Sequence, residues 1–345
     1  MIVRVGFFII AAAVLAACGS VPQTGSQTTL RQIVYGLTLQ PTGFDPHINA
    51  SSELGIPLRS VYDTLIYRDP QTKAFVPGLA TSWTISPDGL TYEFSLRNNV
   101  HFHDNTPFNA QAVAVNLDRI TNPDNASQKA FFMLGSYSGY EIVNDYTIRL
   151  HLAEPYSPLL DSLSQVYLGI ASPAALAATS IERYQFHQVG TGPYRFTDYL
   201  PGDHLTIARN PDYTWGPDFY QDALANAPDE IVFRFYEDPP ARALALQGNE
   251  AQVIGELLPA DARDLSADAD IGLLPVSIPG QPLQFFMNTN RFPTDDERIR
   301  QALLYGANRE AIIDSVYQRF FAGCVGATFS GNRILCARSD RSLCL

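Results

Sequence analysis

VPGLATSWTISPDGLTYEFSLRNNVHFHDNTPFNAQAV, residues 76 to 113, is the stretch of sequence that decides the fold. Within it, Ser86 to Gly89 reads SPDG, in which Pro and Gly favour a tight turn. Thr91 to Arg97 then places an apolar side chain at every second position, which predicts a strand with one buried face. Asn109 is suited to cap a helix over residues 110–120. The stretch therefore predicts a compact strand-and-helix unit.

The same stretch resembles the signature of the extracytoplasmic solute-binding proteins of peptide and nickel ABC importers, solute-binding protein family 5. That family reads P-x-L-A-x-S-W, then D-G-x-x-Y-x-F-x-L-R, then F-H-D-G-x-P-F. Here Asn105 stands where Gly is usual, and Gln111-Ala112 where Glu-Asp is common. VGTGPYRF at residues 189–196 and NPDYTWG at residues 210–216 resemble two further family motifs. The resemblance covers about residues 31 to 320.

The resemblance implies an α/β fold with two lobes, like the periplasmic binding proteins of type II with an extra subdomain, and with the second lobe incomplete. Lobe I is expected at residues 30–280, with an inserted subdomain at about residues 58–175, and lobe II begins at residues 281–323. Residues 324–345 form an aberrant tail that lacks helix or strand periodicity and contains Cys324, Cys336 and Cys344. A frameshift or truncation is the favoured explanation, and a short natural variant with one disulfide is the alternative.

Alternation and turn residues predict the remaining strands. They are expected at residues 31–39, at residues 146–152 with the pattern of an edge strand, and at residues 284–288. The strand after VGTGPYRF should pair with residues 205–208. Gly190 and Gly192 permit positive φ and close backbone approach, and a structural turn is favoured over ligand contact because glycine supplies no recognition group.

Three helices are expected outside the opening stretch. One covers residues 52–65. Another is opened by a capping box at Thr294 to Glu297, with Thr294 as the cap and with Ile299, Leu303 and two small residues along one face. A further helix starts at Asn308.

The N-terminus predicts export. Residues 1–17 contain one basic residue and an apolar run too short to span a bilayer, which is the layout of a signal peptide. Leu15-Ala16-Ala17-Cys18 resembles a lipobox, so Cys18 is expected to carry a lipid anchor, with residues 18–29 as a flexible tether. The alternatives are a secreted protein cleaved nearby and a Cys buried in a short anchor. We expect an extracytoplasmic protein held at the cell membrane, on the periplasmic side or the outer face.

Composition limits the partners. With 23 basic and 35 acidic residues, the net charge of the 345-residue chain is −12, which argues against nucleic acid as a partner and is compatible with a cationic ligand. No transmembrane helix is predicted after residue 18. We expect a monomer without a cofactor.

The sequence gives only weak indications of a metal site or a catalytic site. His101, His103 and Asp104 invite a metal interpretation, but a turn-ordering role is favoured because metal sites need three or four converging ligands. We expect no metal and no catalytic residue, since neither a nucleophile elbow nor a phosphate-binding loop occurs. The chain is therefore predicted not to be an enzyme, and a surface-anchored hydrolase is the less favoured class.

The resemblance implies a substrate-binding lipoprotein that captures peptide-like solutes and delivers them to ABC permease subunits with a separate ATPase. A solute sensor or receptor lipoprotein and a non-functional fragment are the alternatives. The candidate ligand contacts are Thr42, Gly43 and Phe44 in the loop after the first strand, together with Phe285 and Asn288. The ligand itself stays open among a dipeptide, an oligopeptide, a sugar and a metal chelate.

Overall fold

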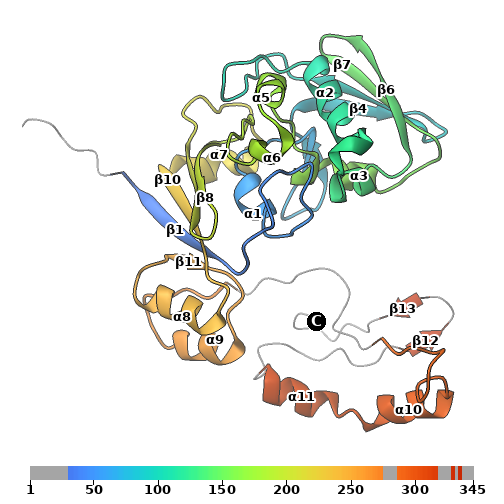
Figure 1. The fold of residues 1–345 in the computed structure, drawn as a ribbon, viewed down its shortest axis with the longest axis vertical. Helices are drawn as coiled ribbons and strands as arrows, with labels where there is room; N and C mark the ends of the chain where they lie inside the picture. Colours follow the sequence, from blue (N-terminus) through green and yellow to red (C-terminus); the bar gives the residue numbers. More distant parts are fainter. Residues whose placement is uncertain (1–29, 275–285, 318–327, 331–332, 336–345) are drawn as a thin grey trace, which may run out of the picture.

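The computed structural model describes residues 30–274, 286–317, 328–330 and 333–335 (Figure 1). The predictions for the signal peptide, Cys18, the tether, Phe285 and the three C-terminal cysteines lie outside the described residues. Among the described helices, none combines the length and the apolar character that crossing a bilayer requires.

A five-stranded sheet joins segments that are far apart in the sequence. Its order is β11-β1-β10-β9-β8, and β1 runs parallel to both of its neighbours, whereas β9 is antiparallel to β10 and to β8. The expected first strand and the expected hairpin are confirmed. The strands are β1 (Gln32–Leu37), β8 (Tyr194–Leu200), β9 (His204–Arg209), β10 (Glu230–Phe235) and β11 (Val253–Ile254).

A four-stranded antiparallel sheet contains two strands from the stretch at residues 76–113. It has the order β4-β5-β7-β6, and β5 and β7 bury alternate residues, as their patterns predict. The prediction that residues 146–152 form an edge strand is wrong, because β7 lies between β5 and β6. Alternation reports one covered face, and a central strand shows it too. The strands are β4 (Ala80–Ile85), β5 (Thr91–Leu96), β6 (Tyr137–Asn144) and β7 (Thr147–Leu152).

Two short pairs complete the strands. β2 (Ile66–Arg68) pairs antiparallel with β3 (Phe75–Pro77). In the tail, where no regular structure is expected, β12 (Thr328–Ser330) pairs antiparallel with β13 (Arg333–Leu335).

Helix α2 (Ala110–Thr121) follows the sequence prediction closely. The Asn109 side chain accepts a hydrogen bond from the amide of Ala112 at 3.0 Å, which confirms the predicted cap. The helix packs beside β6, and Val113, Leu117 and Ile120 are buried.

The other helices of residues 30–274 are short. They are α1 (Gly55–Leu58), η1 (Pro123–Asn125), α3 (Lys129–Met133), α4 (Leu159–Leu163), η2 (Val166–Leu168), α5 (Pro173–Ala178), α6 (Ile181–Tyr184), α7 (Asp218–Ala225), α8 (Pro239–Gln247) and α9 (Pro259–Leu265).

The helix predicted over residues 52–65 is wrong beyond α1. The carbonyls that would continue it are used by distant segments: Tyr194 donates to Ser60, Gly192 to Val61 and Ile170 to Asp63. A helix cannot extend where its carbonyls accept amides from elsewhere.

Residues 286–317 contain α10 (Glu297–Gly306) and α11 (Arg309–Val316). Asp296, not Thr294, caps α10 by accepting from the amide of Arg298, because the Thr294 hydroxyl donates instead to the carbonyl of Asn288 at 2.7 Å. α11 begins directly after Asn308, as predicted, and the Asn308 side chain caps it by accepting from the amide of Ala311 at 3.0 Å. Residues 286–288 are not a strand, contrary to the prediction for residues 284–288.

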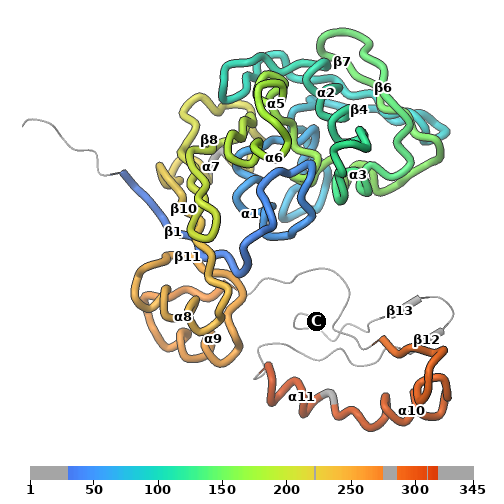
Figure 2. Tube along the Cα trace, viewed as in Figure 1, coloured from blue at the N-terminus to red at the C-terminus, as the bar shows by residue number. Residues whose placement is uncertain are grey.

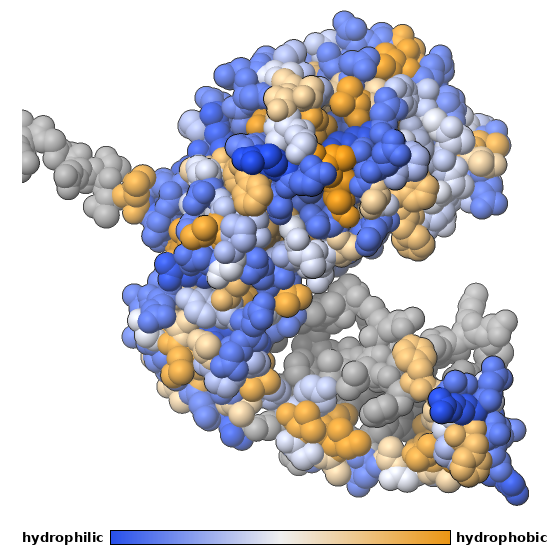
Figure 3. Space-filling model, viewed as in Figure 1, coloured by the Kyte–Doolittle hydropathy of each residue, from blue (hydrophilic) through white to orange (hydrophobic). Residues whose placement is uncertain are grey.

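The core lies in the first part of the chain. One cluster of buried apolar side chains runs from Leu37 to Phe233 and reaches both large sheets. The described side chains of residues 286–317 are all at least partly exposed, and Figure 3 shows apolar side chains at the surface of both helices there.

Candidate functional site

Three parallel strands end at the same edge of the five-stranded sheet. The connection from β10 through α8 to β11 passes from one side of β1 to the other, so the carboxyl end of β1 lies between those of its two neighbours (Figures 1 and 2). We call the segments that follow these strands, residues 38–54, 236–238 and 255–258, the carboxyl edge. Ligands of open α/β sheets bind at such an edge, where the strand order changes direction.

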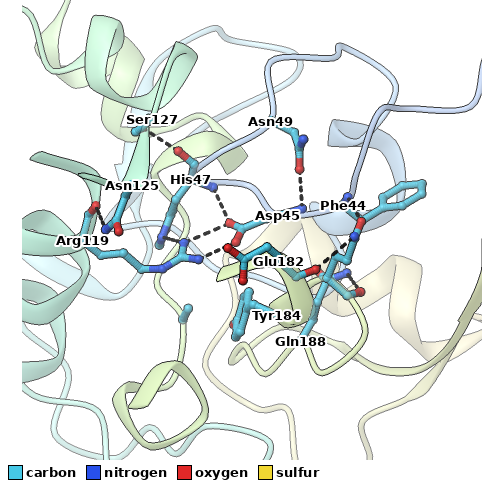
Figure 4. A network of polar contacts seen from close by, with 12 residues as sticks. Phe44, Asp45, His47, Asn49, Arg119, Asn125, Ser127, Glu182, Tyr184 and Gln188 are labelled. Atoms are coloured by element: carbon cyan, nitrogen blue, oxygen red, sulfur yellow. Dashed lines mark hydrogen bonds and ion pairs between the residues drawn. The ribbon is translucent and has the colours of Figure 1, made fainter. Parts of the chain in front are cut away.

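The first loop, residues 38–54, is held at this edge by a buried ion pair (Figure 4). Arg119 of α2 binds both carboxylate oxygens of Asp45, and the two side chains are 9% and 4% exposed. The guanidinium also lies 5.1 Å from the ring centre of Tyr184. A bidentate pair of this kind fixes the orientation of both partners.

His47 extends this pair. Its Nε2 lies 2.8 Å from the carbonyl oxygen of Gly169, which can only accept, so Nε2 carries the proton. Its Nδ1 then accepts from Nη1 of Arg119 at 3.0 Å. Burial, reinforced by the neighbouring Arg119, lowers the pKa of His47 to about 4. The imidazole is therefore neutral at pH 7.

The three first-loop residues that were predicted to touch a ligand differ in exposure. Thr42 is exposed, whereas Gly43 is buried and has no room for a side chain, because a Cβ there would lie 2.7 Å from Oδ1 of Asn49. Phe44 is 0% exposed and packs edge-on against Tyr199, so its ring belongs to the core and cannot reach a ligand. Thr42 alone has the accessibility that a side-chain contact requires.

The structure shows no contact between the first loop and the two other predicted ligand contacts, Asn288 and Phe285, within the residues that it describes. Asn288 is exposed and orders its own turn, accepting from the amide of Asn290 at 3.0 Å. Phe285 lies outside the described residues.

Polar groups of the other two segments also meet at the carboxyl edge. Arg242 of α8, 5% exposed, donates to the carbonyls of Tyr236 and Glu256, at 2.7 and 3.1 Å, and so ties the segments after β10 and β11 together. On β1, burial and then the charges of Glu53 and Glu256 raise the pKa of Tyr35. Oε2 of Glu53 is buried, and no hydrogen-bond partner occurs for it among the described residues. The edge is therefore acidic around Tyr35.

A second buried carboxylate joins the two motifs at residues 189–196 and 210–216. Oδ1 of Asp63 accepts from the hydroxyls of Tyr67 and Tyr213, and Oδ2 accepts from Thr191 and from the Trp215 indole, both at 2.9 Å. The prediction that the first motif is structural agrees with this arrangement. A Cβ at Gly190 would lie 2.0 Å from the carbonyl oxygen of Val61, so close approach requires glycine, whereas neither Gly190 nor Gly192 has positive φ.

Two residues of the candidate metal motif, His103 and Asp104, have structural roles. Nε2 of His103 donates to the carbonyl of Gly192 at 3.0 Å, and the carboxylate of Asp104 accepts from Ser172 and from the amide of Thr106. Burial lowers the pKa of His103 to about 4. Within the described part of the chain, no three His, Cys, Asp or Glu side chains converge as a metal site would require.

Sequence reasoning missed Arg119, Asp63 and Arg242. Asp63 stands alone among mostly apolar residues in VYDTLIY, whereas Arg119 directly follows another charged residue, Asp118, and gives no such signal. An isolated charge in an apolar run signals a buried polar group, although it does not identify the partner.

Comparison with known proteins identifies the relatives of this fold. Residues 74–325 match the family described as bacterial extracellular solute-binding proteins, family 5. The glutathione-binding protein GsiB of Pectobacterium atrosepticum is 33% identical over 316 residues, which cover 91% of this chain and 58% of that protein. The dipeptide-binding protein of Escherichia coli K12 is 31% identical over 315 residues, which cover 84% of this chain and 56% of that protein.

A solved structure shares the architecture. The dipeptide-binding protein from Pseudoalteromonas sp. SM9913, in complex with Met-Leu, superposes with a TM-score of 0.71 at 26% identity, covering 84% of this chain and 59% of that one. The chain thus spans less than two thirds of the length of each of these relatives. The fold is that of the periplasmic binding proteins, in agreement with the predicted fold class.

Proposed function

We propose that this chain, which belongs to family 5 of the bacterial extracellular solute-binding proteins, captures a peptide-like solute outside the cytoplasm for an ABC importer. The family consists of binding proteins of transport systems and not of enzymes, in agreement with the sequence prediction. Two relatives are named for peptide ligands, glutathione and dipeptides, which is why we choose this class of solute.

One observation carries the proposal: the segments after β1, β10 and β11 meet at the carboxyl edge, and buried polar contacts hold them there. A ligand at this edge meets backbone groups and the exposed Thr42. The acidic groups Glu53 and Glu256 near Tyr35 favour a solute with a positive group, such as the ammonium of a peptide.

The proposal assigns roles to the larger segments. Residues 30–280 serve as lobe I, with the inserted subdomain at about residues 58–175, and residues 281–323 begin lobe II. The ligand lies between two lobes, and closure about a hinge buries it. A monomer anchored through lipid at Cys18 then delivers the solute to the permease. Metabolic labelling with palmitate that marks the wild type but not Cys18→Ala supports the anchor, and an unlabelled wild type contradicts it.

The test is direct binding by the full chain. We expect Met-Leu or glutathione to raise the Tm by roughly 5 °C at a concentration near 100 times Kd, because binding the folded state stabilises it. Thr42→Lys should weaken that binding. Thr84→Lys, at an exposed position on the edge strand β4, is the matched control and should leave it unchanged.

Two results contradict the proposal. One is a Tm that neither peptide changes. The other is an equal loss of affinity in the Thr42 and Thr84 variants, which would place the binding site away from the carboxyl edge.

A further inference from the structure

The first loop is anchored at several points along residues 43–51. Oδ1 of Asn49 accepts from the amide of Asp45 at 3.0 Å. The Ser127 hydroxyl donates to the carbonyl of His47, and the Tyr167 hydroxyl to that of Ser51, at 2.6 and 2.8 Å. Thr42 is exposed immediately before this anchored stretch, so its position follows from the anchors.

Arg119 supplies a further anchor, which comes from helix α2. It lies on α2, which packs beside the four-stranded sheet, whereas the first loop continues from β1 of the five-stranded sheet. Its guanidinium binds Asp45 and His47 together, and the Asn125 side chain donates to its carbonyl at 2.7 Å (Figure 4). One side chain therefore links two residues of the loop to the helix that packs beside the other sheet.

Apolar packing alone would not hold this conformation. The buried part of the loop contains a carboxylate and an imidazole, and each would cost free energy without its partner. Lysine offers a point charge where arginine offers a planar fork, so it cannot bind both carboxylate oxygens and Nδ1 of His47 in the same geometry.

We propose that Arg119 is a positioning residue for ligand binding, which holds the first loop through Asp45 and His47 so that the carboxyl edge meets its ligand in a preset conformation. The inference rests on the proposed function. A loop that is ordered before binding does not pay the entropy of ordering when the ligand arrives, and its affinity is higher for that reason. Arg119 itself makes no contact with the ligand in this scheme.

The experiment compares Arg119→Lys with Val113→Ala in the full chain. Val113 is a fully buried residue of the same helix, so its truncation lowers stability while the polar groups that bind the loop all stay in place. Affinities for Met-Leu and glutathione are measured by calorimetry, Tm by scanning calorimetry, and amide hydrogen exchange over residues 38–52 by mass spectrometry.

We expect Arg119→Lys to weaken binding at least tenfold and to speed exchange in residues 38–52 at least tenfold. Val113→Ala should change the affinity less than twofold at a similar loss of Tm. Asp45→Asn should reproduce the loss, and the double variant should lose no more affinity than the weaker-binding single one, because both act through one pair.

Equal affinity losses in Arg119→Lys and Val113→Ala, or unchanged exchange in the loop, would overturn the positioning role. A wild type that binds neither peptide, with exchange in the loop still accelerated by Arg119→Lys, would overturn the proposed function and leave the fixing of the loop established.

Discussion

Asp45 and Asp63 are both buried, but different chemistry surrounds them. Asp45 faces the guanidinium of Arg119, which neutralises its charge. Asp63 receives four neutral donors, from Tyr67, Thr191, Tyr213 and Trp215. In the first arrangement one charged partner, Arg119, and the backbone amide of His47 orient one loop. In the second, donors from three segments of the chain meet at one carboxylate, and it depends on none of them alone.

The difference shows that a buried carboxylate has two structural roles in this protein. A paired charge is directional, so it suits the task of setting a loop against a neighbouring helix. A carboxylate with several neutral donors acts as a junction, since each donor loses its partner if the carboxylate is removed. Substitutions at the two carboxylates and their partners should therefore differ in their cost.

Asp63→Ala should destabilise the protein most. Four donors lose their acceptor, and each buried group left unpaired costs about 1–3 kcal/mol, so the free energy of unfolding should fall by at least about 4 kcal/mol. Urea denaturation followed by Trp fluorescence measures it. A loss below about 2 kcal/mol would show that water replaces the carboxylate and that the junction role is incorrect.

Arg119→Met should lower the free energy of unfolding by about 3 kcal/mol, because it leaves the Asp45 carboxylate buried without its counter-charge. Adding Asp45→Asn should restore part of the loss, since the uncompensated charge is then gone. The same denaturation assay on both variants gives the answer. No recovery in the double variant would mean that Arg119 stabilises through packing on Tyr184 and not through the ion pair.

Acid should lower the stability of the fold through two buried histidines, His47 beside Arg119 and His103 beside Gly192. Burial holds the pKa of His47 and of His103 at about 4, below the 6.5 of a free histidine. The unfolded chain therefore binds more protons between pH 6.5 and 4, and stability falls as the pH drops through that range. Each histidine contributes a slope of about 1.4 kcal/mol per pH unit.

Two single variants, His47→Asn and His103→Asn, separate the contributions of the two histidines to the pH dependence of stability. Each variant should lose about half of the acid slope when the free energy of unfolding is measured between pH 4 and 6.5. A slope that neither substitution alters would assign the acid sensitivity to other groups.

The smallest effect is expected at a surface ion pair. Arg149 bridges Glu93 and Glu141 on the four-stranded sheet, and its side chain is 37% exposed. Arg149→Met should shift the Tm by no more than about 2 °C, because exposed pairs contribute little. A Tm shift as large as the one measured for Arg119→Met would contradict the distinction between buried and exposed ion pairs.

Local sequence patterns predicted much of the secondary structure. The alternation in β5 and β7, the Asn109 cap of α2 and the start of α11 at Asn308 were all predicted, because each depends on residues within a few positions of one another. The prediction failed at residues 59–65, where distant amides take the carbonyls that a helix would use. It also failed at Thr294, because Thr294, Asp295 and Asp296 are all residue types that can cap a helix, and the Thr294 hydroxyl donates to the carbonyl of Asn288 instead.

The sequence by itself indicated the family and the strand-and-helix unit at residues 76–121, and it proposed Thr42, Gly43 and Phe44 together as candidate contacts, of which only the structure singled out Thr42 as exposed. Only the tertiary structure decided that Gln32 pairs with Glu230, that Arg119 reaches Asp45 and that four donors meet at Asp63. Periodicity and capping act over a few residues, so a sequence displays them directly. A buried charge displays only its need for a partner, and which of many distant groups becomes that partner depends on how the whole chain packs.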